Sequence, residues 1–211
     1  MPLSPAGASL RGMAGIGHNK GPSIEPGASW RRYAWGRARA SLIGARLPIE
    51  ILRLRVARAE ALGLAYPTYA RVLMGSGRDI VGFLFTCDAL GLRLQRRLEI
   101  PEAVRDKLAG VVGADLLAFA PEGEDPGLFR QELTEVSGLA ISASGPTPQA
   151  EAPPRRIGAA VRTVLAEAGL PGKGVVLIGA RTAEEAWVTP GRLGSFLAAR
   201  DYFSSSEPAR S

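Results

Sequence analysis

The sequence predicts an α/β fold in which a small parallel sheet of about four strands follows a basic region of three helices. Up to about residue 75, apolar residues recur every three or four positions, which is the period of an amphipathic helix. From residue 79 onward, short continuous apolar runs alternate with segments of helical period. Such alternation is typical of parallel strands that are buried on both faces and joined by helical crossovers.

The N-terminal helices are expected at 30–43, 49–62 and 66–74. The first carries Trp30 and Trp35 on one face, with arginines off it. Pro48 and Pro67 suit the first turns of the second and third helices, because a helix leaves that N–H unpaired anyway. Gly75 is placed to end the third.

The α/β part is expected from about residue 79 to 203, with the last helix at its end. Its strands are predicted at 79–86, 115–120, 139–143 and 174–179, and its helices at 102–111, 128–136, 156–168 and 190–199. This order implies right-handed crossovers between parallel strands. Residues 1–29 and 204–211 are interpreted as disordered tails. Because the helical region 30–75 ends so near the first strand, its helices are expected to pack against the sheet.

The charge is unevenly distributed. Residues 1–60 carry ten Lys/Arg and three Asp/Glu, whereas the other 151 residues carry sixteen basic and seventeen acidic groups. This asymmetry suggests a polyanionic partner for the basic region: nucleic acid, an acidic protein or an anionic membrane surface. The alternative is a solvated arginine-rich surface without a dedicated partner.

Several classes of protein do not fit the composition. With one cysteine, Cys87, and one histidine, His18, the chain has no disulfide framework, no usual zinc spacing and no base for a nucleophilic cysteine. Cys87 is therefore interpreted as a buried structural residue. No apolar run is long enough to span a bilayer, so we expect a cytoplasmic protein. The sequence is also compatible with a homo-oligomer. The Gly-Ile-Gly-His-Asn opening at 15–19 is similar to that of uncharacterised alphaproteobacterial proteins.

One segment, 59–73, has a specific helical pattern. Ala59 is small where two helices would cross, Gly63 would turn the chain, and Thr68 and Arg71 lie on the second helix. The segment resembles the helix-turn-helix core of bacterial repressors of the lactose-repressor type.

That resemblance implies contacts with the DNA major groove or its phosphates. Two residues depart from the pattern: Arg58 stands where an apolar residue is expected, and Tyr69 where a smaller aliphatic residue is usual. The alternative is therefore a plain helix pair packed on the sheet. The expected nucleic-acid contacts are Tyr66, Thr68 and Arg71, together with Arg31, Arg32 and Arg37 of the first helix.

A second pattern occupies 159–187. A helix is followed by a Gly-Leu-Pro turn at 169–171, a buried strand at 175–178, and then Gly179-Ala180. This unit resembles the end of a haloacid-dehalogenase hydrolase, which has Gly-Asp and a second acid that bind magnesium. Ala180 stands where that first Asp belongs.

The same family has two carboxylates just after its first strand, the first of them the nucleophile. Here Thr86-Cys87-Asp88 supplies only the second acid. The resemblance implies a degenerate Rossmann-like domain that has lost the activity. If any activity survives, it implies Mg²⁺ and a phosphorylated small molecule at the residues Asp88, Ser142 or Ser144, and Lys173.

The interpretation we prefer from the sequence is a non-catalytic binding or regulatory protein without a cofactor or metal. Its basic region would contact nucleic acid or an acidic protein, and its α/β domain would act as a scaffold or ligand sensor. The alternative is the degenerate hydrolase.

Overall fold

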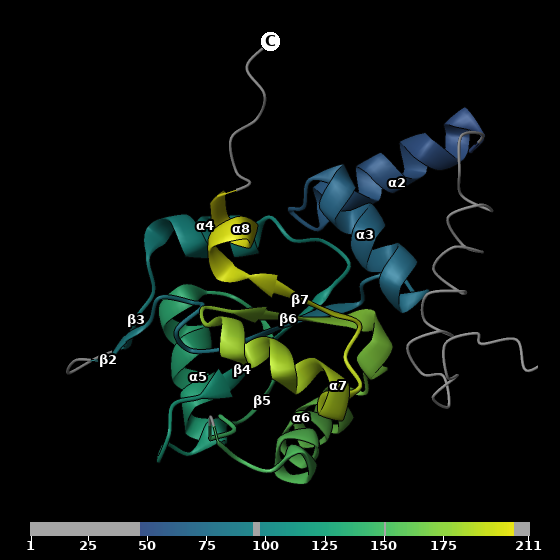
Figure 1. Cartoon of the computed structure of the whole chain (residues 1–211). Coiled ribbons are helices and arrows are strands. Elements are labelled where there is room, and N and C mark those ends of the chain that lie inside the picture. The colour runs from purple at the N-terminus through teal and green to yellow at the C-terminus, as the bar shows by residue number, and fades with distance from the viewer. Residues whose placement is uncertain (1–46, 95–97, 150, 205–211) are drawn as a thin grey trace, which may run out of the picture.

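The computed structural model describes residues 47–94, 98–149 and 151–204 and has a parallel five-stranded sheet between layers of helices (Figure 1). The strand order is β5-β4-β1-β6-β7, and every neighbouring pair is parallel. The predicted α/β, Rossmann-like fold is confirmed, with five strands in place of about four. The strands are β1 (Gly82–Phe85), β4 (Asp115–Ala120), β5 (Ile141–Pro146), β6 (Val175–Gly179) and β7 (Ser195–Ala198).

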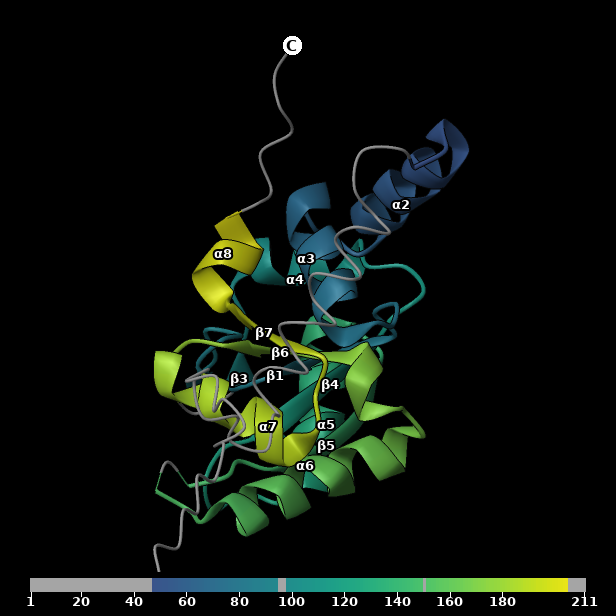
Figure 2. The same cartoon turned by 45° about the vertical axis from the view of Figure 1, so that its right-hand side comes forward.

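Helices cover both faces of the sheet. Successive residues of each strand point to opposite faces, so each strand contributes side chains to two apolar clusters. Phe83 and Phe85 of β1 join one apolar cluster, and Leu84 joins the other. The first cluster lies under α4 (Glu102–Ala109), α5 (Pro126–Ser137) and α8 (Ala199–Ser204), and the second under α6 (Pro154–Ala168), the 3₁₀ segment η2 (Thr182–Trp187) and α7 (Val188–Gly191). Figures 1 and 2 both show α4 and α8 on one side of the sheet and α6 and α7 on the other.

The ends of the crossover helices are set by capping residues in the local sequence. Asp125 caps α5 by accepting the Leu128 backbone N–H, and Pro126 opens the first turn. Gly138 and Gly169, both in the left-handed conformation, end α5 and α6. No helix in the described part of the chain is long and apolar enough to cross a membrane.

The helices α2 (Ile49–Ala61) and α3 (Tyr66–Ser76) pack against the sheet, as expected from the short connection. Leu62 and Val72 are buried in the first cluster, and Gly63 makes the turn with φ of 65°. Residues 49–51, 53 and 54 at the start of α2 are exposed, and Figures 1 and 2 both show its first turns extending away from the sheet. The expected helix at 30–43 and both expected tails lie outside the described residues, apart from Ser204.

Both departures from the helix-turn-helix pattern anchor these helices to the α/β domain. Arg58 pairs with Asp79 at 2.9 Å and donates to the backbone carbonyls of Ile80, Val112 and Gly113 at 2.7–3.1 Å. The Tyr69 hydroxyl donates to the other Asp79 oxygen at 3.0 Å. The helix pair is thus tied to the amino-terminal edge of the sheet through its side chains.

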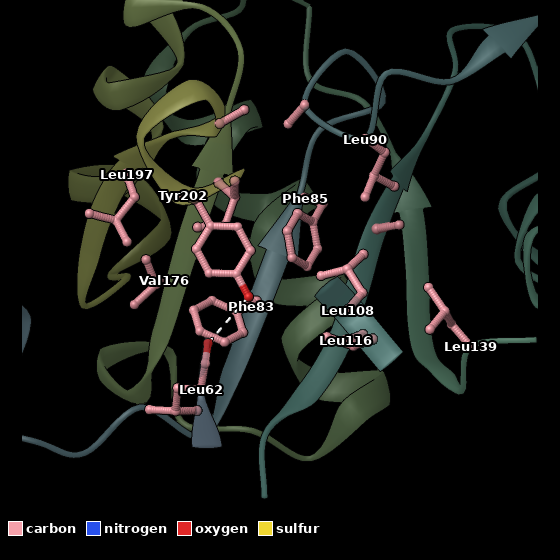
Figure 3. Packing of buried hydrophobic residues seen from close by; sticks show 14 of the residues in the cluster. Leu62, Phe83, Phe85, Leu90, Leu108, Leu116, Leu139, Val176, Leu197 and Tyr202 are labelled. Carbon is pink, nitrogen blue, oxygen red and sulfur yellow. Dashed lines mark hydrogen bonds between the residues drawn. The ribbon is translucent and has the colours of Figure 1, made fainter. Parts of the chain in front are cut away.

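The first cluster has an aromatic centre. Tyr202 of α8 lies against Phe83, with ring centroids 5.2 Å apart, and against Phe85 at 6.0 Å. Figure 3 shows its hydroxyl pointing to Leu62, whose carbonyl accepts the hydrogen bond at 3.3 Å. Lys107 of α4 lies over the Tyr202 ring, 4.6 Å from the centroid, and burial lowers the pKa of Lys107. Tyr202 therefore connects α8, the sheet and the α2–α3 turn.

The prediction of a helix at 190–199 is wrong, because α7 ends at Gly191 and the strand β7 follows. Arg192 adopts φ of 55°, which breaks the helix, and Gly194 donates its N–H to the Val175 carbonyl at 2.8 Å. Pairing with β6 therefore overrides the apolar spacing that favoured a helix. The short hairpin of β2 (Arg93–Leu94) and β3 (Leu98–Glu99) was also not predicted.

Gly194→Ala tests this difference directly. In a helix the change would stabilise the protein, but here the new methyl carbon would lie 2.4 Å from the Lys173 carbonyl oxygen. We expect a loss of about 1–3 kcal/mol in the free energy of unfolding, measured by urea titration. Gly75→Ala, in α3 with open space around it, serves as the control. A gain in stability at Gly194 would contradict the strand.

Candidate functional site

The carboxyl ends of the parallel strands carry a hollow lined by polar residues. A cavity of about 250 Å³ lies between the segments that follow β1, β4, β5 and β6, and a second of about 190 Å³ adjoins it and reaches Trp187. The strand order reverses between β1 and β6, where open α/β sheets bind their ligands. The lining residues of the larger cavity are Thr86, Cys87, Asp88, Pro121, Glu122, Thr147, Arg181 and Glu184.

One arginine bridges two carboxylates at this edge. Arg181 Nη2 lies 3.0 Å from Asp88 Oδ2, and Arg181 Nε lies 3.3 Å from Glu184 Oε1. The Arg181 and Asp88 side chains are 60% and 56% exposed, whereas that of Glu184 is only 3% exposed. Among the described residues, a buried acid therefore has a solvent-exposed cation as its counter-ion.

Local geometry brings Glu184 to the end of β6. Its Oε2 accepts the Arg181 backbone N–H at 3.1 Å and the Thr86 hydroxyl at 3.3 Å. Gly179 permits this placement, since a methyl group there would lie 2.4 Å from Glu184 Oε2 and 2.6 Å from the Phe196 ring. A buried carboxylate is costly unless it is hydrogen-bonded and paired, and Glu184 meets both conditions.

Cys87 is a half-buried thiol in the same cavity. Its Sγ donates to the Phe119 carbonyl oxygen at 2.8 Å. Burial, followed by the nearby charges of Asp88 and Glu124, raises the pKa of Cys87 to about 12. The thiol is therefore a poor nucleophile, in line with the structural role expected for it.

Cys87 should react slowly with iodoacetamide. A pKa of about 12 leaves the thiolate roughly a thousandfold scarcer at pH 8 than a pKa of 9.0 would. We expect alkylation of the native protein, followed by mass spectrometry, to be at least about a hundredfold slower than alkylation of the same chain in urea. Comparable rates in the two states would contradict this environment.

The three residues of the alternative catalytic set are not brought together. Asp88 follows β1 at the carboxyl edge, whereas Lys173 lies in the short 3₁₀ turn just before β6, at the opposite edge. Ser142 lies near the start of β5 and donates to Asp115 at 2.6 Å. Ser144 is buried, its hydroxyl has no partner within the described residues, and it lines neither cavity. Parallel strands place their starts and ends at opposite edges, which separates these positions.

The charges in the cavity also disfavour a phosphorylated substrate. Asp88, Glu122 and Glu184 outnumber the single cation, Arg181, which is already paired with two of them. Thr86, the residue that the haloacid-dehalogenase resemblance aligns with a nucleophile, is buried and donates its hydroxyl to Glu184. Within the described ranges, no group of three or more His, Cys, Asp or Glu is placed to hold a metal ion.

The expected nucleic-acid contacts differ in accessibility. Arg71 is exposed on α3, Thr68 is half-buried, and Tyr66 packs partly against the first apolar cluster. Arg31, Arg32 and Arg37 lie outside the described residues. Of the expected contacts that the structure describes, Arg71 is therefore the one whose side chain is exposed.

Glu184, like Arg181 and Glu122, was not identified as a site residue from the sequence. It stands five residues after Gly179, in the 3₁₀ segment that follows β6, where no apolar period marks it. No family model, curated protein or solved structure matches this chain.

Proposed function

We propose that this chain is a non-catalytic nucleic-acid-binding protein. In this proposal, arginines of α2, α3 and the preceding basic segment contact the phosphate backbone, and the α/β domain holds these helices in place. The observation that carries it is the charge distribution: twelve Lys/Arg and three Asp/Glu precede Asp79, against fourteen and seventeen from Asp79 onward.

The described part of the basic region supports contact with phosphates in particular. Arg53, Arg71 and Arg78 are exposed, and α3 contains no acidic residue. Arg58, in contrast, is used in anchoring. Cations that are free at the surface can replace the counter-ions of a nucleic acid, and the released ions drive association.

The anchoring also favours binding without base recognition. Tyr69 and Val72 face the core, and Tyr66 and Thr68 are half-buried, so Arg71 is the one exposed residue among the three expected groove contacts on α3. Duplexes of unrelated sequence should therefore bind with similar affinity. Strong preference for one duplex would instead favour the helix-turn-helix interpretation.

The non-catalytic part of the proposal rests on the bridged carboxylates. Arg181 pairs with both Asp88 and Glu184, and the described cavity offers no activated nucleophile. Turnover of a generic phosphate ester that depends on Mg²⁺ and is abolished by Asp88→Asn would overturn this part.

Fluorescence anisotropy with a labelled duplex tests the binding mode. At about 100 mM salt, Arg71→Ala should weaken binding about three- to tenfold for every duplex tested, because one phosphate contact is lost. Thr68→Ala should leave the affinity within about twofold. If Thr68→Ala weakened binding to one sequence only, base reading by α3 would replace the backbone model. If Arg71→Ala changed nothing, α3 would not be part of the interface.

A further inference from the structure

The cavity at the strand ends is a second feature that could bind a ligand, and it does not depend on nucleic-acid binding. Segments from four strands converge on it, as described above, and its floor includes Glu184, with only 2% of its surface exposed. A buried carboxylate that faces a cavity strongly favours a positive charge beside it.

The cavity holds more negative than positive charge. Glu122 at its rim accepts a hydrogen bond from the Gln149 amide at 3.2 Å, and within the described chain it has no cationic partner. Arg181 is the one cation that lines the described cavity, and it pairs with both Asp88 and Glu184. One positive charge thus faces three carboxylates. The remaining negative charge of the cavity would be neutralised by one or two further cationic groups.

The counter-ion of Glu184 is also replaceable. Arg181 reaches Glu184 from the solvent side, with its side chain 60% exposed, and its guanidinium is shared with Asp88. The exposed pair of Arg181 with Asp88 is weak. A guest cation that replaced Arg181 beside Glu184 would keep that buried carboxylate paired. A guest cation that entered the cavity would meet Glu122 and Asp88 at the rim and Glu184 on the floor.

We propose that this cavity binds a small organic cation with a primary ammonium or guanidinium group. The group is recognised by Glu184 and Asp88, with Arg181 as its internal competitor, and Glu122 contacts a second donor of the ligand. A volume of about 250 Å³ lies below the range of about 300–1,000 Å³ usual for drug-sized ligands, which favours a small molecule.

Agmatine is a suitable probe, since it carries one guanidinium and one ammonium group. Isothermal titration of the full chain should give saturable binding of agmatine and none of inorganic phosphate or Mg²⁺. Glu184→Gln should weaken agmatine binding at least about tenfold. Glu185→Gln is the matched control, because Glu185 is exposed on the same 3₁₀ segment and lines neither cavity. Its affinity should stay within about twofold of the wild type.

Arg181→Ala keeps the proposal testable if Glu184→Gln fails to fold. This variant leaves Glu184 without its cation, so its melting temperature should fall and should be restored by millimolar methylguanidinium, with little effect on the wild type. Agmatine should also bind Arg181→Ala more tightly than it binds the wild type. Absence of agmatine binding to the wild type, equal effects of Glu184→Gln and Glu185→Gln, or binding of phosphate or Mg²⁺ in its place would overturn the proposal.

Discussion

Tyr202→Ala is expected to lower the free energy of unfolding by about 3–5 kcal/mol, the usual cost of removing a buried aromatic ring. Only 1% of Tyr202 is exposed, and its ring contacts Phe83, Phe85 and Phe203. The ring also lies beneath Lys107, and the Lys107 ammonium donates to the Tyr202 carbonyl. Urea unfolding followed by circular dichroism measures the loss.

Tyr202→Phe separates packing from hydrogen bonding at this position. It keeps the ring and removes only the hydroxyl that donates to the Leu62 carbonyl, so we expect a loss of about 0.5–1.5 kcal/mol. If the alanine and phenylalanine variants were equally unstable, the aromatic centre of the cluster would not have the role described.

Arg58→Ala is expected to cost about 2–4 kcal/mol and to loosen α2 and α3 from the sheet. The change removes one ion pair and three hydrogen bonds to backbone carbonyls, and bonds from charged donors are the stronger class. Proteolysis under native conditions should then cut within 47–78 well before it cuts the sheet.

Arg53→Ala is the control for Arg58→Ala. Arg53 is exposed on the same helix, and its loss should change stability by less than about 0.5 kcal/mol. Equal stability of the two variants would contradict the anchoring of the helices by Arg58.

The parallel α/β core could be predicted because its strands are buried on both faces. Such strands form continuous apolar runs, and at β1, β4 and β6 these runs mark the strands clearly. β7 was missed because it is short and only partly buried, and because its apolar residues also fit a helical spacing. A strand of this kind is specified by its pairing with β6, which local sequence does not encode.

The site could be predicted only in part. Asp88, which follows β1, lies at the carboxyl edge of the sheet, where open α/β sheets bind their ligands. Ser142 was expected at a strand end because the strand was predicted at 139–143, but β5 extends to Pro146 and Ser142 lies near its start. Lys173 was assigned by family resemblance and lies before β6. The pairing of Arg181 with Glu184 depends on the compact 3₁₀ turn after β6 and on the close approach at Gly179, and neither has a periodic signal.

Arg58 and Tyr69 show how a departure from a motif can be informative. Each breaks the helix-turn-helix pattern because it serves another contact, namely the ion pair and hydrogen bonds at Asp79. The same departures restrict α3 to a supporting surface for exposed arginines. This restriction is the reason for proposing phosphate contacts in place of base recognition.

The salt dependence of duplex binding tests the proposed function most directly. The logarithm of the association constant should fall linearly with the logarithm of salt concentration, and replacing Arg53, Arg71 and Arg78 together by alanine should reduce that slope by about two to three. The matched control replaces the exposed Arg155, Arg156 and Arg162 of α6 and should leave the slope unchanged. Binding that is absent, insensitive to salt, or equally affected by both triple variants would contradict a nucleic-acid surface on α2 and α3.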